Sequence, residues 1–189
     1  MSQPELLTFA LNQLERLAIP YMVTGSTVSS IQREPRLTHD IDFVIILESV
    51  SIPGLIEAFS GHSFYLNPAS IQDAIDQRRM FNVIDSSSGN KLDFWMLTDT
   101  EFDKSRFARR QRINALGLDN FIATTPEGAI LSKLRWANEA GGSEKQLTDA
   151  VQVFEMQFDL LDITYLKTWV EELMLQQEWH QLVSRAEPY

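Results

Sequence analysis

The sequence predicts an α/β or α+β core that is followed by a helical tail. Over the first two thirds of the 189-residue chain, short apolar runs alternate with segments whose apolar residues recur at helical spacing. The last third shows helical spacing alone, and this change of pattern separates a mixed core from an all-helical end. No apolar run approaches the roughly 20 residues of a membrane span, so we expect no membrane partner.

Composition and charge narrow the range of functions. Hydrophobic residues make up 44% of the chain and charged residues 22%, as in an ordinary folded domain. The formal net charge is −10, whereas proteins that bind long nucleic acids usually carry an excess of basic residues. The absence of cysteine excludes disulfides, zinc thiolates and thiol nucleophiles. Because the N-terminal residues also show neither a basic region nor a cleavage signal, we expect a cytoplasmic protein.

Prolines and apolar runs define the elements of the first half. Pro20 ends an opening helix, because proline cannot continue one, and Pro35 marks a loop. The run after this loop is rich in β-branched and aromatic residues and is apolar enough to be buried on both faces. In order, the sequence predicts a helix at residues 4–18, a strand at 21–25, a short helix at 26–33, a loop at 33–40, a strand at 41–47 and a helix at 49–61.

Cap and turn residues define the second half. Ser70 is predicted to cap a helix, and Thr125 another, in which Pro126 and Glu127 occupy the first turn. The polar stretch Ser-Ser-Ser-Gly-Asn between two apolar runs indicates a β-hairpin. The predicted elements are a helix at 70–79, hairpin strands at 80–85 and 91–97, a second strand pair at 109–114 and 120–125, a helix at 124–140, and helices over 143–186 with a break near 158–164.

Two aspartates stand one residue apart at the start of the strand after the loop. Because side chains alternate along a strand, Asp40 and Asp42 project from the same face and Ile41 points into the core. Like charges there repel, and burying them is unfavourable without a positive partner. Asp93 is a third carboxylate inside an apolar strand, and it would join them if the two strands pair. Clustered oxygen ligands suit Mg²⁺, and two such ions can clamp the oxygens of a phosphoryl transfer.

Each of these features also has an ordinary structural explanation. An Asp-x-Asp pair can form a loop turn or a helix cap, and Asp93 can be a satisfied carboxylate at a strand end. Gly25-Ser26 can be only a tight turn between a strand and a helix. The basic run at Arg106, Arg109, Arg110 and Arg112 can be a solvated face, although a strand through Arg110 and Arg112 would put both on one side. The combination is far less common than its parts.

The combination resembles the signature of the DNA polymerase β-like nucleotidyltransferase superfamily. Gly25-Ser26 is followed after thirteen residues by Asp40-Ile41-Asp42-Phe43, and Asp93 matches the third carboxylate of that superfamily. The stretch RLTHDID resembles a sequence pattern that is common in the small prokaryotic branches of this superfamily. TTPEGAILSKLRWA and SEKQLTDAVQV resemble two segments of the minimal, AbiEii-like members, although Gly128 stands where that branch often has aspartate. The resemblance covers roughly residues 20–155.

The resemblance implies a mixed nucleotidyltransferase sheet flanked by helices. It implies a core at residues 1–140 and a helical extension at 141–189 packed on it. Asp40 and Asp42 would hold the metal that bridges the triphosphate, whereas Asp93 would hold a second metal and help to deprotonate the acceptor. Gly25, Ser26, Thr38 and Lys133 would bind the nucleotide, while the matching Asp149 is as well explained as a surface residue.

The resemblance implies an enzyme that needs Mg²⁺, with two ions expected. It would transfer a nucleoside monophosphate from an NTP such as ATP to an acceptor hydroxyl, with release of pyrophosphate. RNA, protein and small molecules all remain as acceptors, and a toxin–antitoxin role would add a cognate antitoxin as partner. The alternative is a non-catalytic nucleotide-sensing or partner-binding module on the same fold. Such a module should have lost one of the carboxylates, and this chain retains Asp40, Asp42 and Asp93.

Overall fold

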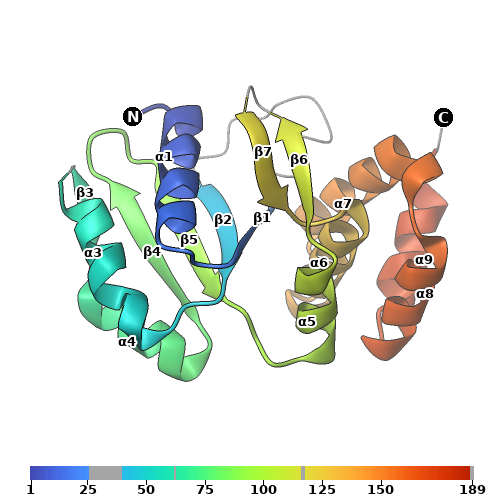
Figure 1. The fold of residues 1–189 in the computed structure, drawn as a ribbon. Coiled ribbons are helices and arrows are strands. Elements are labelled where there is room, and N and C mark those ends of the chain that lie inside the picture. The colour runs from blue at the N-terminus through green and yellow to red at the C-terminus, as the bar shows by residue number, and fades with distance from the viewer. Residues whose placement is uncertain (26–39, 62, 116–117, 188–189) are drawn as a thin grey trace. The chain divides into compact units, whose positions relative to one another are not determined.

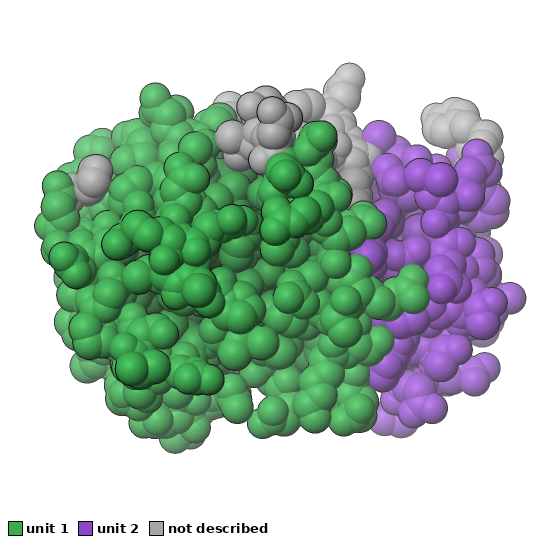
Figure 2. Space-filling model, in the orientation of Figure 1, with its two compact units in different colours: residues 1–27, 36–123 green, residues 28–35, 124–189 purple. Residues whose placement is uncertain are grey.

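The computed structural model describes residues 1–25, 40–61, 63–115 and 118–187. The predicted short helix at 26–33 and most of the predicted loop at 33–40 lie outside these residues. The described chain divides into two compact units, one ending at Ala123 and the other beginning at Thr124 (Figure 2). The boundary expected after residue 140, between a core and a helical extension, stays a prediction.

A mixed sheet forms the first unit, as the sequence predicts. Its strand order is β3-β4-β5-β2-β1-β7-β6, from the left to the right of Figure 1. Strand β2 pairs in parallel with β5 and antiparallel with β1, so two segments distant in sequence become neighbours. The strands are β1 (Tyr21–Thr24), β2 (Asp40–Ile45), β3 (Phe64–Leu66), β4 (Met80–Asp85), β5 (Lys91–Met96), β6 (Gln111–Ala115) and β7 (Leu118–Ala123).

One face of the sheet is apolar and packed. Phe43, Phe94 and Phe81 come from three neighbouring strands, and their rings stack with centroids 5.2 and 5.1 Å apart. Phe59 of helix α3 meets the ring of Phe94 edge to face at 6.4 Å, so this helix covers the packed face. The helices of the first unit are α1 (Gln3–Arg16), α3 (Ile52–Ser60), α4 (Pro68–Gln77) and α5 (Glu101–Ala108). Side chains alternate along each strand, so the residues directly before and after each of these phenylalanines point to the opposite face of the sheet.

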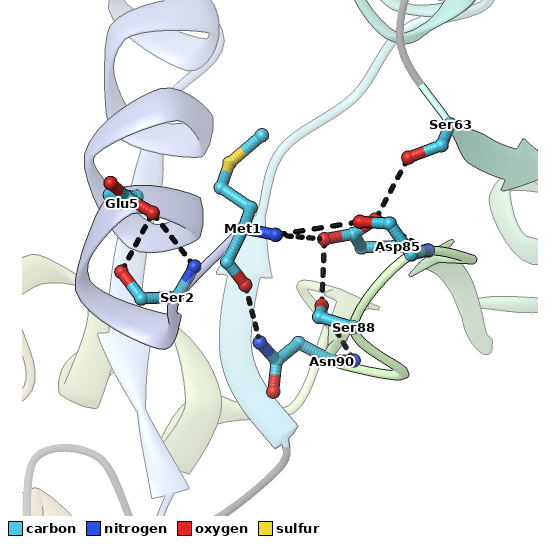
Figure 3. A network of polar contacts seen from close by, with 8 residues as sticks. Met1, Ser2, Glu5, Ser63, Asp85, Ser88 and Asn90 are labelled. Carbon is cyan, nitrogen blue, oxygen red and sulfur yellow. Dashed lines mark hydrogen bonds and ion pairs between the residues drawn. The ribbon is translucent and has the colours of Figure 1, made fainter.

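The predicted hairpin is confirmed as β4 and β5, and Asp85 holds its turn. The Asp85 side chain is buried and lies 3.0 Å from the ammonium group of Met1 (Figure 3). Its carboxylate accepts hydrogen bonds from the hydroxyl groups of Ser87 at 2.6 Å, Ser88 at 2.7 Å and Ser63 at 3.1 Å. These donors, Ser87 above all, hold the pKa of Asp85 well below its usual range. The turn therefore fixes the residue at which β5 begins.

Strand β3 was not predicted, and two further elements of the first unit differ from the sequence prediction. Helix α4 is capped by Asn67, whose side chain accepts a hydrogen bond from the backbone N–H of Ala69 at 3.0 Å. The prediction that Ser70 is the cap is wrong, because Pro68 is well suited to the first helical turn and the helix begins there. Helix α5 was not predicted. Thr100 caps it, because the Thr100 hydroxyl accepts a hydrogen bond from the N–H of Asp103 at 3.2 Å.

The second unit is helical, as predicted. Thr125 caps its first helix by accepting a hydrogen bond from the N–H of Gly128 at 3.2 Å. The predicted break near 158–164 is confirmed by a short 3₁₀ turn at Phe158–Leu160, and a second break, at 173–175, was not predicted. The helices are α6 (Pro126–Glu139), α7 (Glu144–Gln157), α8 (Ile163–Glu172) and α9 (Gln176–Arg185). Within the described ranges, no helix combines the length and apolar character needed to cross a membrane.

Candidate active site

The pairing of β2 with β5 brings the predicted carboxylates onto one face of the sheet. Asp42 lies directly opposite Asp93, and Asp40 lies opposite Lys91. The intervening Ile41 is fully buried on the packed face. The condition under which Asp93 joins Asp40 and Asp42, the pairing of the two strands, is therefore met.

The row that contains Asp42 and Asp93 is polar across four strands. Thr24 of β1 pairs with Asp42, and Asn82 of β4 pairs with Asp93. The next row along the strands is apolar, and Phe107 of α5 packs there against Met22 and Val44. The polar row thus borders a covered part of the same face.

Two side chains that the sequence analysis did not single out contact the carboxylates. The ammonium group of Lys91 lies 2.9 Å from Oδ2 of Asp93 and 3.6 Å from Oδ1 of Asp40. The indole N–H of Trp95 points to Oδ1 of Asp42 at 3.4 Å. Both side chains share the carboxylate face, because β5 residues two apart point the same way.

One carboxylate oxygen of Asp93 is buried without a hydrogen-bond partner among the described residues. Asp93 is only 6% exposed, and its Oδ1 has no hydrogen-bond partner within the described residues. A buried carboxylate oxygen without a partner is unfavourable, so it indicates a missing donor or cation. No three acidic or histidine side chains of the described chain are already arranged as a metal site. The donor set nevertheless fits Mg²⁺, which takes oxygen ligands and needs few of them from protein.

Burial and mutual repulsion perturb these acids. Burial is the main cause that raises the pKa of Asp42 to about 6. The hydrogen bond from Trp95 lowers this pKa, whereas the charges of Asp93 and Asp40 act in the same direction as burial. Burial also raises the pKa of Asp93, although Lys91 acts against this effect. The contact with Asp93 in turn raises the pKa of Lys91. Perturbed pKa values on neighbouring groups are common at sites where proteins bind charged ligands or transfer protons.

The raised pKa of Asp42 predicts a pH-dependent stability. Without metal, protonation of Asp42 should stabilise the fold below about pH 4, and this contribution should vanish as pH rises through about 6. Asp42→Asn removes the titrating group, so the variant should gain on the wild type over this range, by on the order of 2 kcal/mol. Denaturant unfolding of both proteins in chelator at several pH values measures the difference. A difference that does not change with pH would contradict the prediction.

Gly25 lies against Asp42. Its φ of +71° is a conformation that side chains rarely adopt, and a Cβ atom built there would lie 2.8 Å from Cγ of Asp42. Backbone and carboxylate can approach this closely only because residue 25 has no side chain. The contact between this glycine and the acidic strand was not predicted from the sequence.

Of the other predicted nucleotide-binding residues, the structure describes only Lys133. Ser26 and Thr38 lie outside the described residues. Lys133 belongs to α6 of the second unit, where its ammonium group lies 2.8 Å from Oδ2 of Asp149 and 3.4 Å from Oε1 of Gln146. Its contact with phosphate stays a prediction, and the matching Asp149 is its ion-pair partner.

The basic run of the sequence is not one continuous patch. Arg106 lies in α5, 3.3 Å from a carboxylate oxygen of Asp103. Arg110 stacks over the ring of Phe107 at 4.1 Å and precedes β6, so the placement of Arg110 and Arg112 on one strand is wrong. Arg112 donates a hydrogen bond to the carbonyl oxygen of Asn120 at 3.0 Å. Two of these contacts thus lie within α5 and within the β6–β7 hairpin, and that of Arg110 joins the residue before β6 to α5.

Comparison with solved structures identifies the fold. The chain superposes on the solution structure of the antibiotic-resistance factor ANT(2'')-Ia with a TM-score of 0.59 at 13% identity, covering 96% of this chain and 95% of that one. It matches the crystal structure of ANT(2'')-Ia in complex with adenylyl-2''-tobramycin with a TM-score of 0.62 at 11% identity, covering 94% and 99%. The chain has a nucleotidyltransferase fold.

A fungal structure with this fold is similar too. It is an antigenic nucleotidyltransferase-like protein from Paracoccidioides brasiliensis, with a TM-score of 0.55 at 15% identity, covering 98% of this chain and 93% of that one. No protein-family model matches the sequence, and no curated protein does either. At these identities the likeness concerns the nucleotidyltransferase fold, and the chemistry has to be argued from the site.

Proposed function

We propose that this protein transfers a nucleoside monophosphate from an NTP to an acceptor hydroxyl and releases pyrophosphate. The observation that carries the proposal is the pairing of Asp42 with Asp93 on adjacent strands. Strands held by a packed reverse face position acidic groups rigidly, which phosphoryl transfer requires. The nucleotidyltransferase fold supports this reaction class.

The carboxylates divide the work of this reaction. Asp40 and Asp42 would hold a divalent cation, and Mg²⁺ there supplies positive charge that offsets the charge of the triphosphate. Asp93 would hold a second ion and take the proton of the acceptor hydroxyl, for which a raised pKa is suited. The acceptor oxygen bonds to the α-phosphorus as the bond from that phosphorus to the bridging oxygen breaks, and pyrophosphate leaves with that oxygen.

The triphosphate would lie along the backbone at Gly25. A glycine there lets the main chain approach an anion closely. Ser26, Thr38 and Lys133 would add donors, as the resemblance to the superfamily implies. These contacts would orient the α-phosphorus toward the acceptor.

We favour a small hydroxyl compound over a long RNA as acceptor. The net charge of −10 repels a polyanion. One similar structure contains adenylyl-2''-tobramycin, in which the adenylyl group is attached to a small molecule. An RNA or protein acceptor, with the cognate antitoxin that an AbiEii-like enzyme would have, is the alternative outcome of the assay.

Ligand-dependent melting tests the binding half of the proposal. A non-hydrolysable NTP with Mg²⁺ should raise the melting temperature by several degrees, because a ligand that binds only the folded state stabilises it. Asp42→Asn should lose this shift. Asp73→Asn makes the same chemical change on the exposed surface of α4 and should keep it. An unchanged shift in Asp42→Asn would remove the metal role of this site.

Label transfer tests the catalytic half. The protein is incubated with Mg²⁺, each α-³²P-labelled NTP and cell extract separated into RNA, protein and small-molecule fractions. We expect one NTP to label the small-molecule fraction. Labelling of RNA or protein would favour the toxin-type alternative, and nucleotide binding without labelling of any fraction would favour the sensing module.

A further inference from the structure

A lysine lies inside the acidic cluster, where the proposed function needs a metal ion. Lys91 is paired in register with Asp40, and its ammonium group contacts both Asp93 and Asp40. The Lys91 side chain is 29% exposed, whereas that of Asp93 is 9% exposed. The ammonium group of a partly exposed side chain therefore contacts a buried carboxylate.

The charges explain why a cation is needed there. Asp40, Asp42 and Asp93 would together carry three negative charges on one face of two paired strands. A buried carboxylate without a positive neighbour is strongly unfavourable, and Lys91 supplies one positive charge without any ligand. The same position makes Lys91 a competitor, because an ammonium and a divalent cation at the same oxygens repel each other.

We propose that Lys91 is the resident counterion of this site, which neutralises Asp93 and Asp40 until a divalent cation displaces it. The inference rests on the proposed function, since it takes the carboxylates to be cation ligands. Oδ2 of Asp93 is held by Lys91 while Oδ1 has no partner in the described chain, so the carboxylate is satisfied on one side only. A cation that binds Asp93 through both oxygens has to break the lysine contact. Lys91 is thus a positioning residue that sets how tightly the site binds metal.

This arrangement predicts opposite effects of one substitution. Lys91→Met keeps an unbranched side chain but removes the charge. The metal-free protein should melt at a lower temperature, because Asp93 loses its partner. Its affinity for a divalent cation should rise about tenfold, because the competing charge is gone. Lys91→Arg should instead bind the cation more weakly than the wild type, since a planar guanidinium holds a carboxylate with two hydrogen bonds.

Manganese alone is the probe, without nucleotide or acceptor. Titration with Mn²⁺, followed by the paramagnetic resonance signal of the free ion, gives the dissociation constant for each variant. Lys104→Met is the matched control, because Lys104 is exposed, lies 3.3 Å from Glu101 on α5 and carries the same charge. Lys91→Gln replaces Lys91→Met if the latter does not fold. We expect the order of affinity to be Lys91→Met, then wild type and Lys104→Met together, then Lys91→Arg.

The outcomes separate this inference from the proposed function. If the wild type binds Mn²⁺ and Asp42→Asn does not, but Lys91→Met binds no more tightly than the wild type, the counterion role is wrong and the metal site stands. If Lys104→Met gains as much affinity as Lys91→Met, the effect is one of net charge and the local role is also wrong. If no variant binds Mn²⁺, the proposed metal site fails and the counterion role fails with it.

Discussion

Asp93→Ala is expected to lower the turnover of nucleotidyl transfer by about a thousandfold while changing nucleotide affinity little. In the proposed reaction Asp93 acts at the acceptor oxygen, whereas Asp40 and Asp42 hold the cation that accompanies the triphosphate. A group used mainly in the transition state affects turnover more than ground-state binding. Single-turnover rates at saturating NTP, together with titration of a non-hydrolysable analogue, measure the two effects separately.

Asp99→Ala is the control for this substitution, because Asp99 has an exposed side chain. It should keep the wild-type turnover. Equal losses of affinity and turnover in Asp93→Ala would instead place Asp93 among the groups that bind the triphosphate. Retained turnover would remove it from the reaction altogether.

Gly25→Ala is expected to lower activity by about a hundredfold and to destabilise the protein by about 2 kcal/mol. The new Cβ would push on the carboxylate of Asp42, which lies 2.8 Å away at Cγ, and would also be strained at a φ of +71°. The displaced Asp42 could no longer share a cation with its neighbours. Turnover measurements and denaturant unfolding measure the two losses.

Gly89→Ala separates the clash from the strain. Gly89 has a φ of +76°, but a Cβ built there meets nothing within 4 Å. Its replacement should therefore cause a similar strain and leave activity intact. If Gly25→Ala lost no more activity than Gly89→Ala, the contact between Gly25 and Asp42 would have no functional importance.

Local patterns were sufficient to predict the hairpin and the common face of Asp40 and Asp42, whereas the approach of Asp93 depended on whether two distant strands pair. The Ser-Ser-Ser-Gly-Asn turn indicates that β4 and β5 are neighbours, and alternation along each strand predicts that Asp40 and Asp42 share a face. The apolar surroundings of Asp93 made it conspicuous. These signals depend on adjacent residues, so a single sequence contains them.

The partners of the acids could not be predicted in this way. Lys91 meets Asp40 only because β2 and β5 pair in one particular register across 51 positions of sequence. A shift by one residue would send Lys91 to the packed face. The contact of Trp95 with Asp42 depends on the same register. In addition, a tryptophan in an apolar strand is ordinarily a core residue, so the sequence did not indicate this contact. Helix α5 escaped prediction because its apolar residues are few and its charged residues suggested a solvated run.

The stack of Phe43, Phe94 and Phe81 on the reverse of the sheet has a consequence for how this protein can evolve. The stacked rings that join β2, β4 and β5 point away from the side chains that are proposed to do chemistry. Substitutions on the acidic face, including changes that admit a new acceptor, therefore leave the aromatic packing untouched. Lineages of such a protein could exchange substrates through few mutations and still fold, because the stacked rings lie on the face opposite the acids.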